Sequence, residues 1–151
     1  MPQQNSPFTP QQLAEQVRDA MWAGDHATKM LGMEITAVGP GRAAIRMTVR
    51  QDMLNGHGIC HGGLITTLAD SAFAFACNSY NELTVASGFT VDLLAPGQLG
   101  DVLTATGHEV SKAGRTGVYD IVVTNQRDER IALLRGRSYT MRGKPVVILP
   151  A

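Results

Sequence analysis

The chain has 151 residues, enough for one domain with a sizeable core. Its 13 basic and 13 acidic residues cancel, which excludes the strong positive charge typical of proteins that bind nucleic acid or anionic membranes. Charged residues make up only 17% of the chain, below the usual fraction of about 25%. We therefore expect part of the surface to be hidden, either in an oligomer or around an apolar ligand.

The ends of the chain and its cysteines indicate where the protein resides. The opening MPQQNSPFTP lacks the apolar core of a secretory signal, and no segment is long enough to cross a bilayer. Cys60 and Cys77 fit reduced thiols. We expect a cytoplasmic protein with no membrane or nucleic-acid partner. Residues 1–8 are predicted to form a flexible tail, and residues 9–151 a single domain.

Two helices are predicted first. Thr9 suits the N-cap of a helix that has Pro10 at its first position and Gln12 to complete a capping box. This helix is expected to end at Gly24. The following stretch, DHATKMLG, predicts a short second helix that ends at Gly32.

Strands dominate the rest of the chain. In GRAAIRMTVR, small and apolar residues alternate with three arginines, the pattern of a half-buried strand in a hairpin. Four further strands are predicted at TVASGFTVDLL, DVLTATGHEV, GVYDIVVTNQ and RIALLRGRSYTM, separated by turns at APGQLG, KAGRTG and RDE. The order predicts an α+β fold, with one principal helix packed on an antiparallel sheet.

That principal helix follows the stretch NGHGICHGG, and residues 64–80 form two arcs on a helical wheel. One arc is apolar and is expected to pack on the sheet. The other contains Thr66, Thr67, Asp70, Ser71, Cys77 and Asn78, without lysine, arginine or glutamate. Asp70 therefore either faces a partner chain or ligand, or is one exposed acid on an amphipathic helix; the residues alone leave both interpretations open.

The glycines before the helix also allow two interpretations. The first N–H groups of a helix lack internal partners, and glycine lets a ligand oxygen approach them, which favours an oxyanion site. The alternative is a turn without a ligand. A metal site at His57, Cys60 and His61 is disfavoured because no second spaced pair of ligands is present. A thiol nucleophile at Cys60 is disfavoured because neighbours in a loop rarely have the required geometry.

The same segments resemble a known family. NGHGICHGGLITTLADSAFAFACN, ASGFTVDLLAPGQLGDVLTATG and GRTGVYDIVVTNQ are similar to the hotdog-fold acyl-CoA thioesterases, in particular to the PaaI-type phenylacetyl-CoA thioesterases of phenylacetic acid degradation. The resemblance covers roughly residues 10–143. It implies a long central helix wrapped by an antiparallel sheet, hydrolysis of acyl-CoA esters with no metal or cofactor, and homodimers that pair into homotetramers.

The resemblance also assigns roles to individual residues. Asp70 matches the catalytic carboxylate, which acts as nucleophile or as general base towards water. Gly62 matches the glycine whose backbone N–H polarises the thioester carbonyl. His61 is implied to help position that carbonyl, and Asn55 matches a polar residue near the reacting centre.

Substrate-binding positions follow in the same way. Gly63 is implied to let the acyl group pass the helix start, and Thr66 neighbours the carboxylate. Lys112, Arg115 and Thr116 lie where the family binds the nucleotide end of coenzyme A, although a solvated turn is an equally good interpretation of these residues alone. Small or flat side chains of an acyl slot are expected among Ala69, Phe73, Ala74 and Gly88.

Spacing predicts that the site is shared between two chains. Gly62 and Asp70 are eight residues apart, or about 12 Å along one helix. Both must lie within ~3 Å of one reacting group, so each site is expected to join Gly62 of one chain to Asp70 of an antiparallel partner. Two other functions stay open: a non-catalytic acyl-CoA binding module, and a hotdog hydratase or dehydratase, whose acid–histidine motif is missing here.

Overall fold

A computed structural model describes residues 6–150 of the chain, so the first five residues of the predicted tail and Ala151 lie outside the described residues. Helix α1 spans Pro10–Ala23 and has the predicted capping box. Thr9 Oγ1 accepts from Gln12 N–H at 3.1 Å, and Thr9 N–H donates to Gln12 Oε1 at 2.9 Å. A short helix α2 follows at His26–Met30. Both predicted helices are therefore confirmed.

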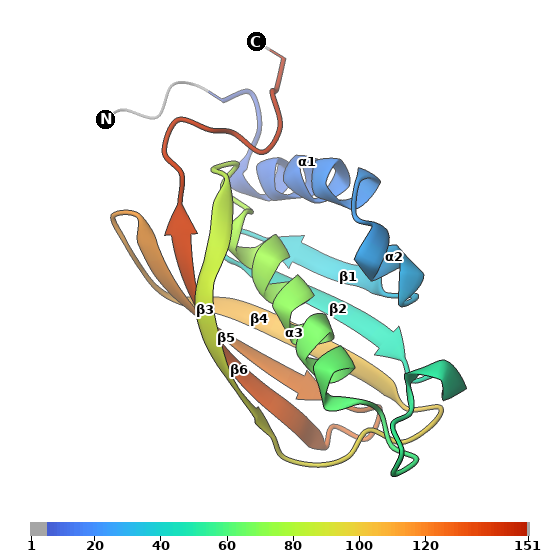
Figure 1. Ribbon diagram of the computed structural model, residues 1–151. Helices are drawn as coiled ribbons and strands as arrows, with labels where there is room; N and C mark the ends of the chain where they lie inside the picture. Colours follow the sequence, from blue (N-terminus) through green and yellow to red (C-terminus); the bar gives the residue numbers. More distant parts are fainter. Residues whose placement is uncertain (1–5, 151) are drawn as a thin grey trace.

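Six strands form one antiparallel sheet in the order β1-β2-β4-β5-β6-β3. Their bounds are β1 Glu34–Gly39, β2 Arg42–Thr48, β3 Thr84–Leu93, β4 Val102–Ala113, β5 Thr116–Thr124 and β6 Arg130–Thr140. A 3-10 turn at Gln51–Met53 follows β2. The sheet curves around the long helix α3, Gly62–Cys77, while α1 lies beside β1 (Figure 1). The predicted α+β fold, with a central helix wrapped by an antiparallel sheet, is confirmed.

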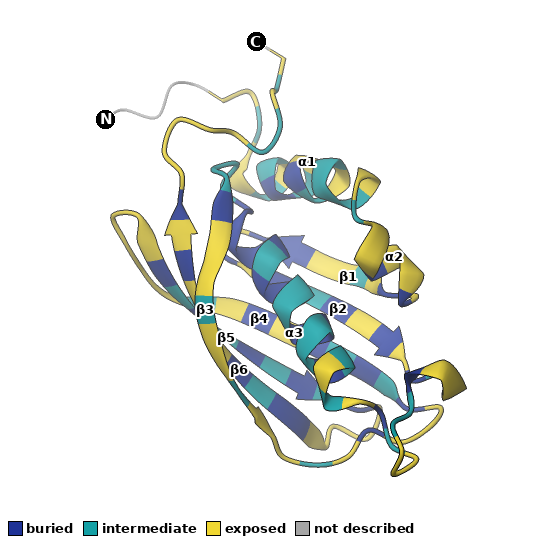
Figure 2. Cartoon of the chain, viewed as in Figure 1, coloured by how far each residue is buried: buried dark blue, intermediate teal, exposed yellow. Residues whose placement is uncertain are grey.

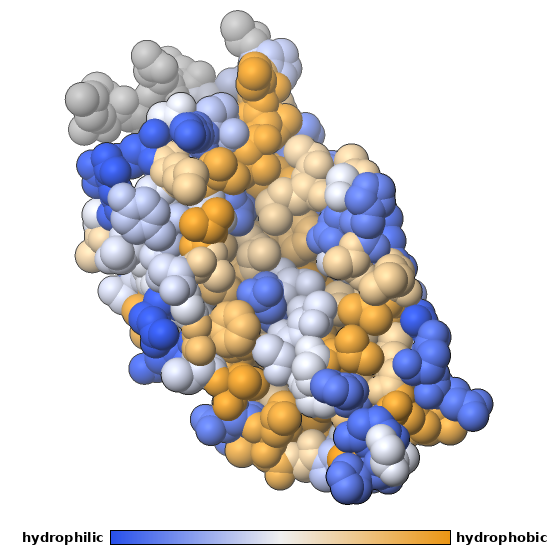
Figure 3. Space-filling model, viewed as in Figure 1, coloured by the Kyte–Doolittle hydropathy of each residue, from blue (hydrophilic) through white to orange (hydrophobic). Residues whose placement is uncertain are grey.

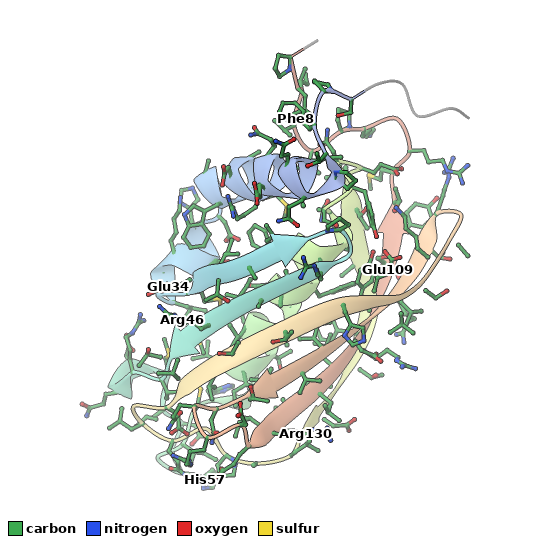
Figure 4. All side chains as sticks on the ribbon, turned by 180° about the vertical axis from the view of Figure 1, so that it is seen from behind. Phe8, Glu34, Arg46, His57, Glu109 and Arg130 are labelled. Carbon is green, nitrogen blue, oxygen red and sulfur yellow. The ribbon has the colours of Figure 1, made fainter. Side chains whose placement is uncertain are left out.

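The core lies between α3 and the concave face of the sheet. In β2 the predicted alternation holds, because Ala43, Ile45 and Met47 are buried there while the arginines face outward. On this outer face Arg46 pairs with Glu34 of β1 at 2.6 Å (Figure 4). From α3, the buried residues include Leu68 and Phe73, which pack against this apolar layer.

The C-terminal end of α3 differs from the helical-wheel prediction. The helix ends at Cys77, and Cys77 and Asn78 are buried although the wheel places them on the polar arc. The Asn78 amide is satisfied inside the protein: it donates to Ala74 O and Thr84 O, each at 2.9 Å, and accepts from Thr84 N–H at 2.9 Å. The polar groups of Asn78 therefore stabilise the turn into β3 and do not face an outer surface.

The turn between β4 and β5 is shorter than the predicted KAGRTG. The strands continue to Ala113 and resume at Thr116, so only Gly114 and Arg115 connect them. Gly114 has φ of 60°, in the left-handed region that glycine adopts readily.

Strand β3 is an edge of the sheet and is exposed over most of its length (Figure 2). Its exposed side chains include Val85 at 41%, Phe89 at 37% and Leu93 at 53%. An exposed edge with apolar side chains is able to pair with a strand of another chain. None of the helices within residues 6–150 has the length and apolar character needed to traverse a bilayer.

Candidate active site

The start of α3 leaves one backbone donor free. His61 is the N-cap, and its Nδ1 accepts a hydrogen bond from Gly63 N–H at 2.9 Å. The N–H groups of Leu64 and Ile65 donate to His61 O. Within the described chain, the Gly62 N–H has no acceptor. It is therefore able to bind a ligand oxygen at the positive end of the helix dipole.

Asn55 organises the glycine-rich turn before this helix. Its Oδ1 accepts from His57 N–H at 2.9 Å and from Ile59 N–H at 3.4 Å, and its backbone carbonyl accepts from Gly58 N–H at 3.0 Å. These bonds use the amide oxygen, so the Nδ2 group is left to bind a ligand. His57 is exposed in the same turn, at the end of the molecule opposite Phe8 (Figure 4).

An apolar hollow of about 370 Å³ joins Gly62 to Asn55. Ile65 of α3 and Leu93 and Leu94 at the end of β3 line it. A Cβ atom at position 62 would lie 2.6 Å from Leu93 Cδ1, so the glycine lets the leucine side chain reach the helix start. The hollow combines two hydrogen-bond donors with apolar walls, the usual composition of a small-ligand site.

Asp70 lies in a different hollow, of about 350 Å³, on the same helix. Phe73, Ala74 and Cys77 line it from α3, and Val85 lines it from β3. The face that carries this helix is mostly pale to orange through its middle, where one hydrophilic patch lies among the paler side chains, and further hydrophilic side chains gather at its edges (Figure 3). Burial raises the pKa of the Asp70 carboxyl above 3.8, and no neighbouring cation or hydrogen-bond donor offsets the effect.

The structure thus separates two groups that the sequence assigns to one reaction. Gly62 and Asn55 share one hollow, whereas Asp70 lies in the other. The chain therefore carries these groups in two separate hollows. Of the expected slot residues, Phe73 and Ala74 line the Asp70 hollow, but Ala69 is buried in the core.

Gly88 is also absent from the lining of the Asp70 hollow, because it lies on β3 against Arg137 of the neighbouring strand.

Thr66 and Gly63 form hydrogen bonds that stabilise the start of α3. Thr66 Oγ1 donates to Gly62 O at 2.8 Å, and the Gly63 N–H is occupied by the His61 ring. The ring carries its own proton on Nε2, since Nδ1 accepts, and it is therefore a second side-chain donor beside the helix start.

The three residues at the β4–β5 turn lie far from Gly62 in the same chain, near the opposite end of α3 (Figure 1). Lys112 Nζ lies 4.1 Å from the centre of the Tyr80 ring and 3.7 Å from Glu82 Oε1. Arg115 Nη1 donates to the Tyr139 hydroxyl at 3.1 Å. These contacts fix each basic side chain on the surface.

Thr116, the third of these residues, donates from Oγ1 to Ala113 O at 3.1 Å across the turn.

The metal site and the thiol nucleophile, which the sequence disfavours for the glycine-rich stretch, gain no support from the structure. In residues 6–150, no group of three or more metal-binding side chains comes together. Cys60 is buried, and burial raises the pKa of its thiol, which disfavours the thiolate that a nucleophile requires.

Among the lining residues of the Asp70 hollow that sequence reasoning missed are Met21 of α1 and Val146 near the C-terminal end. Neither lies in a motif, and both reach the hollow only through tertiary folding. Leu93 was also missed, although its place at the end of an apolar strand was a signal that it could meet another element.

Comparisons with known proteins identify the family of the chain. Residues 57–132 match the model of the thioesterase superfamily. The chain is 48% identical over 124 residues to the acyl-coenzyme A thioesterase PaaI of Escherichia coli K12, covering 82% of this chain and 89% of that protein.

Two solved structures extend the comparison. The E. coli PaaI protein from the phenylacetic acid degradation operon superposes with a TM-score of 0.88 at 45% identity, covering 90% of this chain and 99% of that one. A hypothetical thioesterase from Streptococcus pneumoniae TIGR4, solved with coenzyme A, gives 0.70 at 28% identity, covering 72% and 88%. The family match, together with the identity to the E. coli protein, shows that this chain belongs to the thioesterase superfamily.

Proposed function

We propose that the protein is an acyl-CoA thioesterase that hydrolyses phenylacetyl-CoA, or its ring-hydroxylated relatives, to the free acid and coenzyme A. The observation that carries the proposal is the pair of half-sites on α3: a free Gly62 N–H in one apolar hollow and a lone carboxylate of raised pKa in the other. The E. coli relative is named an acyl-coenzyme A thioesterase, and the E. coli PaaI protein of known structure comes from the phenylacetic acid degradation operon. No metal or organic cofactor takes part.

The chemistry follows from the two groups. The thioester oxygen accepts a hydrogen bond from Gly62 N–H, and the Nε2 of His61 and the Nδ2 of Asn55 help to hold it, so that negative charge developing on the oxygen is stabilised. Asp70 then either takes a proton from a water that adds to the carbonyl carbon, or attacks that carbon itself and is released by water. In both routes the C–S bond breaks, and the coenzyme A thiolate leaves and gains a proton.

The proposal requires a homodimer in which Gly62 of one chain meets Asp70 of its partner. Two features support it. The polar arc of α3 carries no lysine, arginine or glutamate, and β3 presents an unpaired edge with exposed Val85 and Phe89. Pairing of two β3 edges would bring two α3 helices side by side in opposite directions. Two such dimers then form a homotetramer.

This dimer also gives the β4–β5 turn a role. Lys112, Arg115 and Thr116 lie near the C-terminal end of their own α3, which an antiparallel partner sets beside its Gly62. We assign them to the nucleotide end of coenzyme A, whose phosphates suit basic side chains. Gly63 and Thr66 flank the path of the acyl group. We assign the reaction to the cytoplasm, a reducing compartment that suits the two free cysteines.

The test is release of free thiol from a panel of acyl-CoA esters, with phenylacetyl-CoA compared against long aliphatic esters. We expect phenylacetyl-CoA to have the higher kcat/KM. Asp70→Asn is expected to retain binding of acyl-CoA and to lose at least ~100-fold in kcat, the effect typical of one acid–base group. Preference for long aliphatic esters would contradict the aryl substrate. Near-normal turnover of the variant would contradict the role of Asp70.

Two other outcomes would identify a different function. Tight binding of acyl-CoA without thiol release would indicate a binding module. Change in the acyl chain with the thioester intact would indicate a hydratase or dehydratase. Treatment with a chelator is expected to leave the activity unchanged.

A further inference from the structure

The C-terminal segment folds back onto the connection between α3 and β3. We call residues 141–150 the C-terminal strap. Its first part is fixed by the backbone, since Met141 N–H donates to Leu83 O and Leu83 N–H donates to Lys144 O, each at 2.8 Å. The strap leaves β6 and passes over the end of the molecule that carries the start of β3 (Figure 1).

Asn81 fixes the second part of the strap. Its Nδ2 donates to Val147 O at 3.0 Å, and its Oδ1 accepts from Val147 N–H at 2.9 Å, so one side chain satisfies both backbone groups of Val147. Asn81 has φ of 60°, in the left-handed region that asparagine adopts more readily than most residues. The same residue therefore forms the turn and clamps the strap.

Val146 lies between these two attachments and lines the hollow that contains Asp70. Met21 of α1 and Val85 of β3 line the hollow with it. Without the strap the hollow would lose the lining that Val146 provides. Ile148, two residues further on, is 89% exposed and does not line the hollow.

We infer that Val146 determines which acyl groups fit beside Asp70, and that Asn81 is a positioning residue that holds Val146 in place. The inference rests on the proposed function, because it places the acyl group in the hollow with Asp70. An aryl ring whose carbonyl carbon is near Asp70 extends into the hollow that Val146 also lines, so its far end can meet that wall. Groups that extend the ring at that end meet the strap and bind poorly.

The decisive measurement is the ratio of kcat/KM for 4-ethylphenylacetyl-CoA to that for phenylacetyl-CoA. Val146→Ala removes two methyl groups from the wall, and the ethyl group adds two carbons to the substrate. We expect the ratio to rise about 10-fold, the usual effect of one or two methylenes in an apolar pocket. Ile148→Ala, the matched control on the same strap, is expected to leave the ratio unchanged. An unchanged ratio in Val146→Ala would overturn the inference.

Asn81→Gly tests the clamp, because glycine keeps the left-handed turn and removes both side-chain hydrogen bonds. We expect the ratio to rise in this variant while kcat for phenylacetyl-CoA is retained. The double variant with Val146→Ala is expected to add little to Val146→Ala alone. A merely structural role of Asn81 would instead lower the rates for both substrates equally and leave the ratio unaltered, which would overturn its assignment.

Failure of this inference is distinguishable from failure of the proposed function. If the wild-type protein releases no thiol from any acyl-CoA, the proposed function is wrong, and the inference is overturned with it. If the wild-type protein hydrolyses phenylacetyl-CoA and the strap variants keep the wild-type ratio, only the inference is wrong.

Discussion

The Asp70 carboxyl is harder to ionise than that of an exposed aspartate, because burial acts on it and no neighbour compensates. Its pKa is raised above 3.8 by desolvation alone. Asp120 is the opposite case: Arg135 donates to both of its carboxylate oxygens at 2.7 Å and lowers its pKa. The two residues therefore contribute to stability with opposite dependence on pH.

A raised pKa in the folded state means that Asp70 stabilises the fold when protonated. That contribution is fully present below the unfolded pKa, near 3.8, and is lost as the pH rises through the folded pKa. At pH 7 the charged form destabilises the wild type, so Asp70→Asn is expected to have the higher Tm. The difference should shrink as the pH is lowered through the folded pKa of Asp70. Thermal unfolding at several pH values measures it.

Asp120→Asn provides the control with the opposite sign. The ion pair with Arg135 stabilises the fold above the unfolded pKa and is lost as the pH falls through the lowered folded pKa. This variant is expected to have a slightly lower Tm than the wild type at pH 7, since the pair is partly exposed and screened. If Asp70→Asn also lowered Tm at pH 7, burial would not be the dominant influence on Asp70.

At the scale of elements, one aromatic ring fixes α3 against the sheet. Phe73 is 1% exposed and packs against Tyr119 of β5, with ring centroids 5.5 Å apart. Gly136 of β6 makes room for it, because a Cβ atom there would lie 2.7 Å from Phe73 Cε1. Although the ring borders the Asp70 hollow, moving it aside would break its packing against Tyr119.

Gly136→Ala is therefore expected to overpack the core and lower the free energy of unfolding by about 1–3 kcal/mol. Gly24→Ala is the matched control, since no atom lies within 4 Å of a Cβ there and the φ of Gly24 is −104°. Urea unfolding of both variants measures the difference. Equal stability of Gly136→Ala and the wild type would mean that Phe73 can shift at no cost.

The sequence predicts local structure correctly where that structure depends on residues close together in the chain. The capping box at Thr9 and the alternation in β2 depend on neighbours along the chain, and both were predicted correctly. The wheel failed at Cys77 and Asn78, because burial there depends on how the chain returns from α3 into Thr84. No local pattern contains that information.

In the candidate site, too, some residues could be predicted from local sequence and others could not. Asp70 could be selected as a candidate site residue because it is the one carboxylate on an otherwise uncharged polar arc, and Gly62 because it begins a helix. Val146 could not be predicted, since its place in the hollow depends on hydrogen bonds between the strap and residues about 60 positions earlier in the chain. Resemblance suggests which chemical groups react, whereas tertiary contacts define the walls around them.

At the scale of the whole molecule, the proposed reaction needs a second chain to bring Gly62 and Asp70 together. Gly62 and Asp70 are separated by about 12 Å along α3 and open into different hollows. A two-fold dimer would place each half-site against its complement in two equivalent sites. Two different inactive variants should therefore restore each other's activity when they share a dimer.

Gly62→Pro and Asp70→Asn are suited to this experiment. Proline removes the Gly62 N–H, and it is favoured at the first position of a helix. His61, the residue before it, has ψ of 127°, which is the extended conformation that a following proline requires. The exposed Leu93 side chain, which lies close to position 62, must turn away from the proline ring. Each variant alone is expected to fold, to dimerise and to be inactive.

Unfolded and refolded together in equal amounts, the two variants should form mixed dimers for half of the population. Each mixed dimer has one doubly defective site and one site with both Gly62 and Asp70 intact, so about a quarter of wild-type activity should return. Refolding Asp70→Asn with the double variant Asp70→Asn/Gly62→Pro is the control, since no combination of those chains contains the carboxylate. Subunit exchange is verified with a tag on one variant. If mixed dimers form and thiol release stays at the level of the control, Gly62 and Asp70 do not act across the interface.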